Sequence, residues 1–145
     1  MSLANIKTQI KANLDELVTA TTLGEVHADD FSADPLQRNI ANYPAAILTT
    51  PYVESEPLTN LENKRTAVFE VLIIEKQDNI SNINDLETLI EAVLDKFDQD
   101  ITLNGEAINI EPTTSPAVPS VTKVHGHMIM FALILRVNYC VESSA

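Results

Sequence analysis

The sequence predicts an α+β fold, with a mostly antiparallel sheet of about four long strands and two helices packed on one face of the sheet. Three observations lead to this prediction. Two segments repeat their apolar residues every three or four positions, as amphipathic helices do. Other segments have apolar residues at alternate positions or in continuous runs, as strands do. The connections between the segments are rich in turn-forming residues. At 145 residues the chain has the length of a single domain, residues 1–145.

The first helix is expected over residues 3–19. Its apolar residues recur three or four positions apart, which aligns them along the side of a helix that faces the core. On the solvated side, Lys11 and Asp15 have the i,i+4 spacing of a helical ion pair. The residues of the apolar stripe are Leu3, Ile6, Ile10, Leu14 and Leu17.

The segment from Thr19 to Asn42 loses this periodicity and is expected to be a long connection, with a short strand at Leu23–His27. Apolar residues and Thr then predict an extended segment over Tyr43–Val53. Its two prolines cannot donate ladder hydrogen bonds, which favours an edge or terminal strand. The polar, Pro-interrupted segment 54–64 is predicted to be a loop.

Two strands are predicted with the clearest patterns. Arg65–Lys76 is apolar on both faces except at Glu70, which indicates a central strand covered on both sides, by helices or by a neighbouring subunit. His127–Val141 is apolar on both faces in its first half and amphipathic in its second half. Such a change is typical of a strand that runs out of the covered middle of a sheet toward solvent.

A second amphipathic helix is expected over residues 84–98, where Asn84 and Glu87 have the spacing of a capping box. After it, Ile101–Leu103 and Ala107–Ile110 flank Asn104-Gly105. Asn-Gly readily adopts the positive φ angles of a type I′ turn, so this segment is predicted to be a tight hairpin.

The Pro-rich segment 112–126 is predicted to be an extended arm or loop, because its prolines interrupt any continuous strand. It is long for a small domain, and the strands carry more apolar surface than two helices would cover. We therefore expect it to contact another subunit, although a mobile loop explains its composition equally well. The candidate interface residues are Pro112, Pro116, Val118, Pro119, Val121 and Val124.

The chain is strongly acidic, with 21 Asp and Glu against 9 Lys and Arg and a formal charge of −12. This balance disfavours DNA wrapping, which depends on clustered basic residues. It suits either simple solubility or a conduit through which DNA slides without binding. The lone Cys140 provides no internal disulfide, and neither a secretory signal nor a membrane-length apolar run is present, so assembly in the cytoplasm is expected.

No catalytic, cofactor-binding or metal-binding residues are predicted. The glycines are isolated, so no nucleotide-binding loop can be assembled. His125 and His127 could ligate a metal with a carboxylate, but a polar loop before a strand explains them more simply. The same holds for His27, which precedes two turn-forming Asp residues, and Cys140 lacks an active-site signature. A small ligand-binding or enzymatic domain built on the His pair stays an alternative.

The order of elements resembles that of the tail terminator family of long-tailed phages, the lambda-type ring protein and its relatives. The resemblance covers nearly the whole chain and rests on the order of the elements, their lengths and their patterns of apolar and polar residues. The segments that carry it are LANIKTQIKANLDEL, YPAAILTTPYV, RTAVFEVLIIEK, NDLETLIEAVLDKF, GEAINIEP and HMIMFALILRVNYCV.

This resemblance implies a non-enzymatic structural protein of the virion, located in the tail and neck and assembled in the host cytoplasm. It implies a homo-hexameric ring that ends tube polymerisation and provides the head-tail joining surface. The implied partners are the tail tube protein and a head-tail connector or neck protein, with DNA passing through the lumen without specific binding. A head-tail adaptor or stopper neck protein is the nearest alternative.

Overall fold

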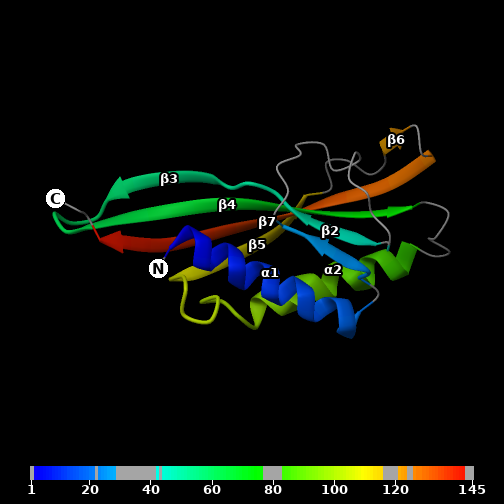
Figure 1. Ribbon diagram of the computed structural model, residues 1–145, viewed down its shortest axis with the longest axis horizontal. Helices are drawn as coiled ribbons and strands as arrows, with labels where there is room; N and C mark the ends of the chain where they lie inside the picture. The colour runs from blue at the N-terminus through cyan, green and yellow to red at the C-terminus, as the bar shows by residue number, and fades with distance from the viewer. Residues whose placement is uncertain are drawn as a thin grey trace.

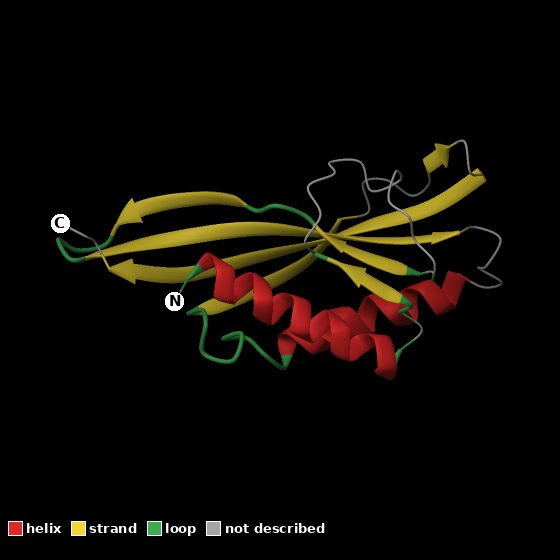
Figure 2. Ribbon diagram, viewed as in Figure 1, coloured by secondary structure: helices red, strands yellow, loops and turns green. Residues whose placement is uncertain are grey.

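The computed structural model describes residues 2–21, 23–28, 42, 44–76, 83–115, 121–123 and 126–142, and these form the expected α+β fold (Figure 1). Both helices lie on the same side of one sheet (Figure 2). In chain order the described elements are α1 (Leu3–Ala20), β1 (Glu25–His27), β2 (Ala45–Leu48), β3 (Tyr52–Pro57), β4 (Glu62–Lys76), α2 (Ile83–Asp98), β5 (Asn109–Ser115), β6 (Val121–Lys123) and β7 (Gly126–Glu142).

The sheet has the order β1-β2-β4-β7-β5, while β3 pairs with β4 and β6 pairs with β7. Only the β1–β2 pair is parallel among the described strands, which confirms a mostly antiparallel sheet. There are more strands than predicted, and the long ones are β4 with 15 residues and β7 with 17. The short strand expected at Leu23–His27 is confirmed as β1.

The two predicted helices are confirmed. The hydroxyl of Ser2 caps α1 by accepting the Asn5 N–H at 3.2 Å. The helix α2 begins at Ile83, so Asn84 lies inside its first turn and not at the cap. Lys96 of α2 pairs with Glu16 of α1 and joins the helices at the surface. The helix residues that form the core are Ile6, Ile10, Leu14, Leu17, Leu89, Val93 and Phe97, each at most 5% exposed.

The helix-facing side of β4 and β7 supplies the rest of the core. The two strands pair antiparallel from Glu62 with Glu142 to Lys76 with Met128. Both predicted strands are confirmed with somewhat wider limits, and β4 holds the predicted central position, between β2 and β7. The side chains on this face are Ala67, Phe69, Val71, Ile73, Leu133, Leu135, Val137 and Tyr139, each at most 1% exposed.

The other face of β2 and β4 is also buried in this half of the sheet. Ala45 and Ile47 of β2, and Leu72 and Ile74 of β4, are at most 7% exposed within the single chain. The double-sided apolar pattern of β4 is therefore satisfied here without a second subunit. These residues therefore leave no exposed apolar sheet surface for another chain, and the expected contact between subunits stays a prediction.

The prediction of a single extended segment at Tyr43–Val53 is wrong, because residues 49–51 separate β2 from β3 there. Leu48 pairs with Val71 and Tyr52 pairs with Val68, so three residues on this side oppose two on β4. This extra residue acts as a bulge and reverses the faces, since side chains in a strand alternate. The even-numbered residues of β2 face the helices, whereas those of β3 face away.

The loop predicted at 54–64 is also wrong, because β3 and the start of β4 form a hairpin closed by residues 58–61. The N–H groups of Leu58 and Thr59 donate to the carbonyl of Glu62 at 3.0 and 3.1 Å. The Thr59 hydroxyl accepts the N–H groups of Leu61 and Glu62. Polar residues on both faces suit a strand that has no helix over it, and the same composition is typical of a loop.

The hairpin predicted at 101–110 is wrong as well. The backbone at Leu103, Asn104 and Gly105 has φ angles of 49°, 55° and 85°, so the Asn-Gly pair does adopt positive φ. However, the chain continues through turns to β5, which pairs with β7 and not with residues 101–103. Leu103 is 0% exposed, so core packing takes priority over a local strand.

The extended arm predicted at 112–126 is wrong for its described residues. Pro112 lies in β5 opposite Leu135, and Val121 lies in β6 opposite Met128. β5 is the last strand at its end of the sheet order, and a strand at a sheet edge tolerates a residue without an N–H. The remaining candidates Pro116, Val118, Pro119 and Val124 lie outside the described residues.

A buried polar contact fixes the turn after α2 against α1. The Asp100 carboxylate accepts hydrogen bonds from Asn13 Nδ2 at 2.9 Å and Gln9 Nε2 at 3.3 Å. Its other oxygen accepts the Asn104 N–H at 2.8 Å. Asn13 is only 3% exposed, so this carboxylate is what satisfies a buried amide.

Candidate interaction surface

The sheet continues past the helices as a bare projection (Figure 1). We call this projection the arm and define it as β3, the turn 58–61, residues 62–65 of β4 and residues 140–142 of β7. Every residue of β3 is exposed. Large apolar side chains are exposed on β3 and the turn, with Tyr52 at 65%, Leu58 at 55% and Leu61 at 70%. A concentration of exposed apolar side chains on a projecting hairpin is typical of a protein contact surface.

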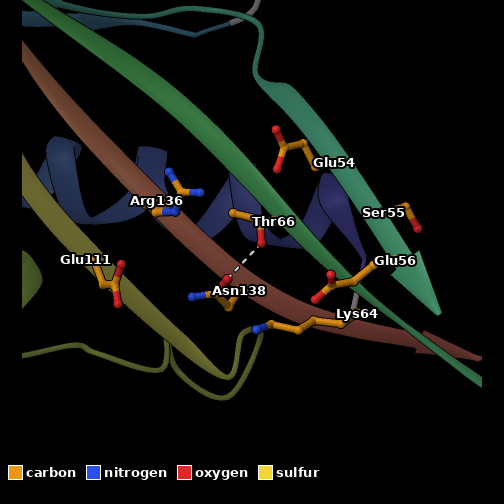
Figure 3. A pocket seen from close by; sticks show the side chains of 8 residues that line it. All are labelled: Glu54, Ser55, Glu56, Lys64, Thr66, Glu111, Arg136 and Asn138. Carbon is orange, nitrogen blue, oxygen red and sulfur yellow. Dashed lines mark hydrogen bonds between the residues drawn. The ribbon is translucent and has the colours of Figure 1, made fainter. Parts of the chain in front are cut away.

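The face of the sheet opposite the helices holds a polar trough of about 690 Å³ (Figure 3). Four strands contribute to it, because β3, β4, β7 and β5 lie side by side there. Ser55 belongs to the other face by its position in β3, and Figure 3 shows its side chain turned away from the rest. The residues that line the trough are Glu54, Ser55, Glu56, Lys64, Thr66, Glu111, Arg136 and Asn138.

A hydrogen-bonded rung crosses the floor of the trough. Thr66 Oγ1 donates to Asn138 Oδ1 at 2.9 Å, and Asn138 Nδ2 donates to Asn109 Oδ1 at 2.7 Å. The three residues are paired across β4, β7 and β5, so the bonds run perpendicular to the strands. Glu54 extends the same row onto β3, opposite Thr66.

The trough carries three carboxylates and two cations. Glu54, Glu56 and Glu111 lie around Lys64 and Arg136 (Figure 3). Of the ion pairs between described residues, none joins any two of these five side chains. Within the trough, these charges are therefore not neutralised by ion pairs between described residues.

Tyr52 lies at the edge of this charged region. Its hydroxyl donates to Glu54 Oε1 at 3.1 Å. This hydrogen bond, together with the negative charge of Glu54, raises the pKa of the Tyr52 phenol above its ordinary value of 10.0. The hydroxyl therefore keeps its proton, and it remains a donor, at the pH of ordinary solutions.

The described candidates for chemistry, His27, His127 and Cys140, lie at separate positions in the sheet. His125 lies outside the described residues, and His127 is described only as a β7 residue opposite Thr122. His27 Nε2 lies 2.7 Å from Glu25 Oε2 on β1. Cys140 is half-buried on β7, opposite Lys64. In the described part of the chain, no three His, Cys, Asp or Glu side chains are grouped so that they could hold a metal ion.

Neither the trough nor the arm is predicted from the sequence. Glu54 and Glu56 belong to the segment predicted as a loop, and Glu111 precedes the proline that was expected to interrupt a strand. A pattern typical of a strand is present in the segment YVESEP, where the larger side chains Tyr, Glu and Glu alternate with the smaller Val, Ser and Pro. Its mixed polarity and its proline concealed that alternation.

Comparison with protein-family models and with curated proteins gives no match for this chain. Within the described residues, neither helix combines the length and the apolar character needed to cross a membrane.

Proposed function

We propose that this chain is the tail terminator of a long-tailed phage. In this role it forms a homo-hexameric ring at the head-proximal end of the tail tube and ends polymerisation of the tube. The opposite face of the ring joins the tail to a connector or neck protein. The proposal rests on the resemblance in element order, and the α+β fold with two helices on one face is consistent with it.

The arm is the observation that carries the structural part of this proposal. A ring of identical subunits needs two different surfaces on each subunit, one that projects and one that receives. The arm is a projecting surface, and Leu58 and Leu61 at its turn expose apolar side chains that water solvates poorly. Burial of these two side chains against a neighbouring subunit would stabilise the ring.

The mechanism needs no catalytic chemistry. One face of the ring imitates a tube subunit, and the other face offers no site for a further tube ring. The formal charge of −12 suits passage of DNA through the lumen, because an acidic wall gains nothing from contact with phosphates. The ring would therefore act through shape and contacts alone.

Deletion of the gene tests this function in the genome that carries it. We expect overlong tails, or tails that cannot join heads, by negative-stain electron microscopy, with recovery when the wild-type chain is supplied from a plasmid. The double substitution Leu58→Ser and Leu61→Ser should fail to restore normal tails. Normal tails accompanied by heads that leak DNA would contradict a terminator and indicate a head-tail adaptor or stopper.

A further inference from the structure

The outer edge of β3 has backbone groups that face away from the sheet. The Leu58 N–H donates to the Glu62 carbonyl, which marks that pair as hydrogen-bonded. Hydrogen-bonded and non-hydrogen-bonded pairs alternate along an antiparallel ladder. Glu54 and Glu56 therefore direct their backbone groups toward β4, whereas Val53 and Ser55 direct theirs outward. Pro57 also falls in the outward series, so its missing N–H costs the β4 ladder nothing.

This edge is unpaired among the described residues, since β3 pairs there with β4 alone. It is also exposed along all six residues. An exposed edge of this kind is a template onto which another extended chain can add through main-chain hydrogen bonds. The outward N–H and C=O groups of Val53 and Ser55 and the outward C=O of Pro57 are the groups such a chain would meet.

The charge next to this edge selects the partner. Glu54 and Glu56 lie on the face that carries the trough, two positions apart. A strand added to β3 would place alternate side chains on the same face, directly beside these two carboxylates. Opposite charges in such cross-strand positions stabilise the pairing and like charges oppose it. From these observations we propose that the β3 edge binds an extended segment of a different protein that carries Lys or Arg at alternate positions.

A second copy of this chain does not fit the same edge. Pairing β3 with another β3 would bring Glu54 and Glu56 of both copies together. No described strand carries two basic residues at positions two apart, and the strands that contain any Lys or Arg are already paired. The proposal therefore goes beyond the homo-hexameric ring and does not depend on it.

Glu54, Glu56 and Pro57 also resemble the devices that protect edge strands from aggregation. Protection alone predicts that the edge binds nothing. Selective protection predicts that the edge excludes acidic strands and admits basic ones. The experiment below separates these outcomes.

The test measures binding of fluorescein-labelled peptides of about ten residues, long enough to form one strand, to the full chain by fluorescence anisotropy. One peptide alternates Lys with Val, a second alternates Glu with Val, and a third alternates Lys with Pro. The Lys-Pro peptide has the same charge but cannot supply ladder N–H groups. We expect the Lys-Val peptide to bind and the other two to bind at least about ten-fold more weakly, because the Glu-Val peptide meets like charges and the Lys-Pro peptide lacks main-chain hydrogen bonds.

Substitution at Ser55 isolates the backbone contribution. Ser55→Pro removes an outward N–H, whereas Ser55→Ala keeps it, and both lose the 3.4 Å hydrogen bond from Arg65 Nε to the Ser55 hydroxyl. We expect Ser55→Pro to weaken Lys-Val peptide binding on the order of ten-fold relative to Ser55→Ala. The double variant Glu54→Gln and Glu56→Gln should also weaken binding and reduce its dependence on salt.

Amide hydrogen exchange in the wild-type chain provides a readout that no substitution can disturb. The Lys-Val peptide should slow exchange at Val53 and Ser55, while the amides of Glu54 and Glu56, already bonded to β4, should change little. Equal binding of the Lys-Val and Lys-Pro peptides would overturn the proposal, and so would absence of binding or unchanged exchange at Val53 and Ser55.

Discussion

The two halves of the sheet are built from the same two long strands but have opposite surroundings. In the half that the helices cover, β4 carries Phe69, Val71 and Ile73, which are all 0% exposed. In the arm, the same strand carries Asn63, Lys64 and Arg65, which are partly exposed. A strand of 15 residues thus changes from core element to surface element without a break in its pairing. A strand can be paired without being buried, and only burial produces a strong apolar pattern in its sequence.

The largest difference between the halves should appear in the response to loss of an aromatic ring. Phe69→Ala removes a fully buried side chain and should lower the free energy of unfolding by about 3–5 kcal/mol. Tyr52→Ala removes a ring that is 65% exposed and should change it by less than about 0.5 kcal/mol. Urea denaturation followed by circular dichroism gives both values. A similar loss for the two variants would show that the arm is covered within the single chain.

A smaller difference is expected for polar contacts. Asp100→Ala leaves the Asn13 amide buried and without its acceptor, which should cost about 1–3 kcal/mol in the free energy of unfolding. Thr66→Ala breaks one bond in the rung of the trough, where water can replace the hydroxyl, and should cost less than about 1 kcal/mol. The same denaturation experiment compares them, with the exposed Asp95→Ala as a control. The comparison fails if Thr66→Ala is the more destabilising change.

The smallest effect concerns the titration of Tyr52. Its pKa is raised by the hydrogen bond to Glu54 and by the charge of that residue, so Glu54→Gln should lower the Tyr52 pKa toward its ordinary value. A raised pKa gives the folded state an advantage that is complete below the ordinary tyrosine pKa and is lost as the pH rises through the folded value. NMR titration of the ring resonances measures the shift. No change in the Glu54→Gln variant would mean that Glu54 does not act on the phenol.

The covered half could largely be predicted from the sequence, and the arm could not. The stripe from Leu3 to Leu17 and the alternation in β7 are local patterns set by burial, and both elements lie where these patterns indicate. Burial imposes no such pattern on β3, where mixed polar residues suggested a loop. A regular apolar pattern arises where one face of an element is buried, and the arm is surrounded by solvent.

The wrong predictions share a second cause, which is non-local pairing. Ala107–Ile110 looked like half of a local hairpin, yet the strand that begins at Asn109 pairs with β7, where Asn109 lies opposite Asn138. Pro112 looked like an interruption, yet its place at a sheet edge makes it harmless. The residues of the trough come together only because four strands pair in a particular register. Their spacing in the chain therefore could not predict the trough.

Native mass spectrometry of the intact chain, alone and with tail tube protein, tests most directly whether the arm joins identical subunits. A six-subunit species is expected for the wild type. It should also form in Ile101→Ser, which replaces an apolar side chain of 53% exposure outside the arm. The double variant Leu58→Ser and Leu61→Ser should give smaller species while keeping the wild-type circular dichroism spectrum. A wild-type chain that stays a single subunit under both conditions would contradict the account.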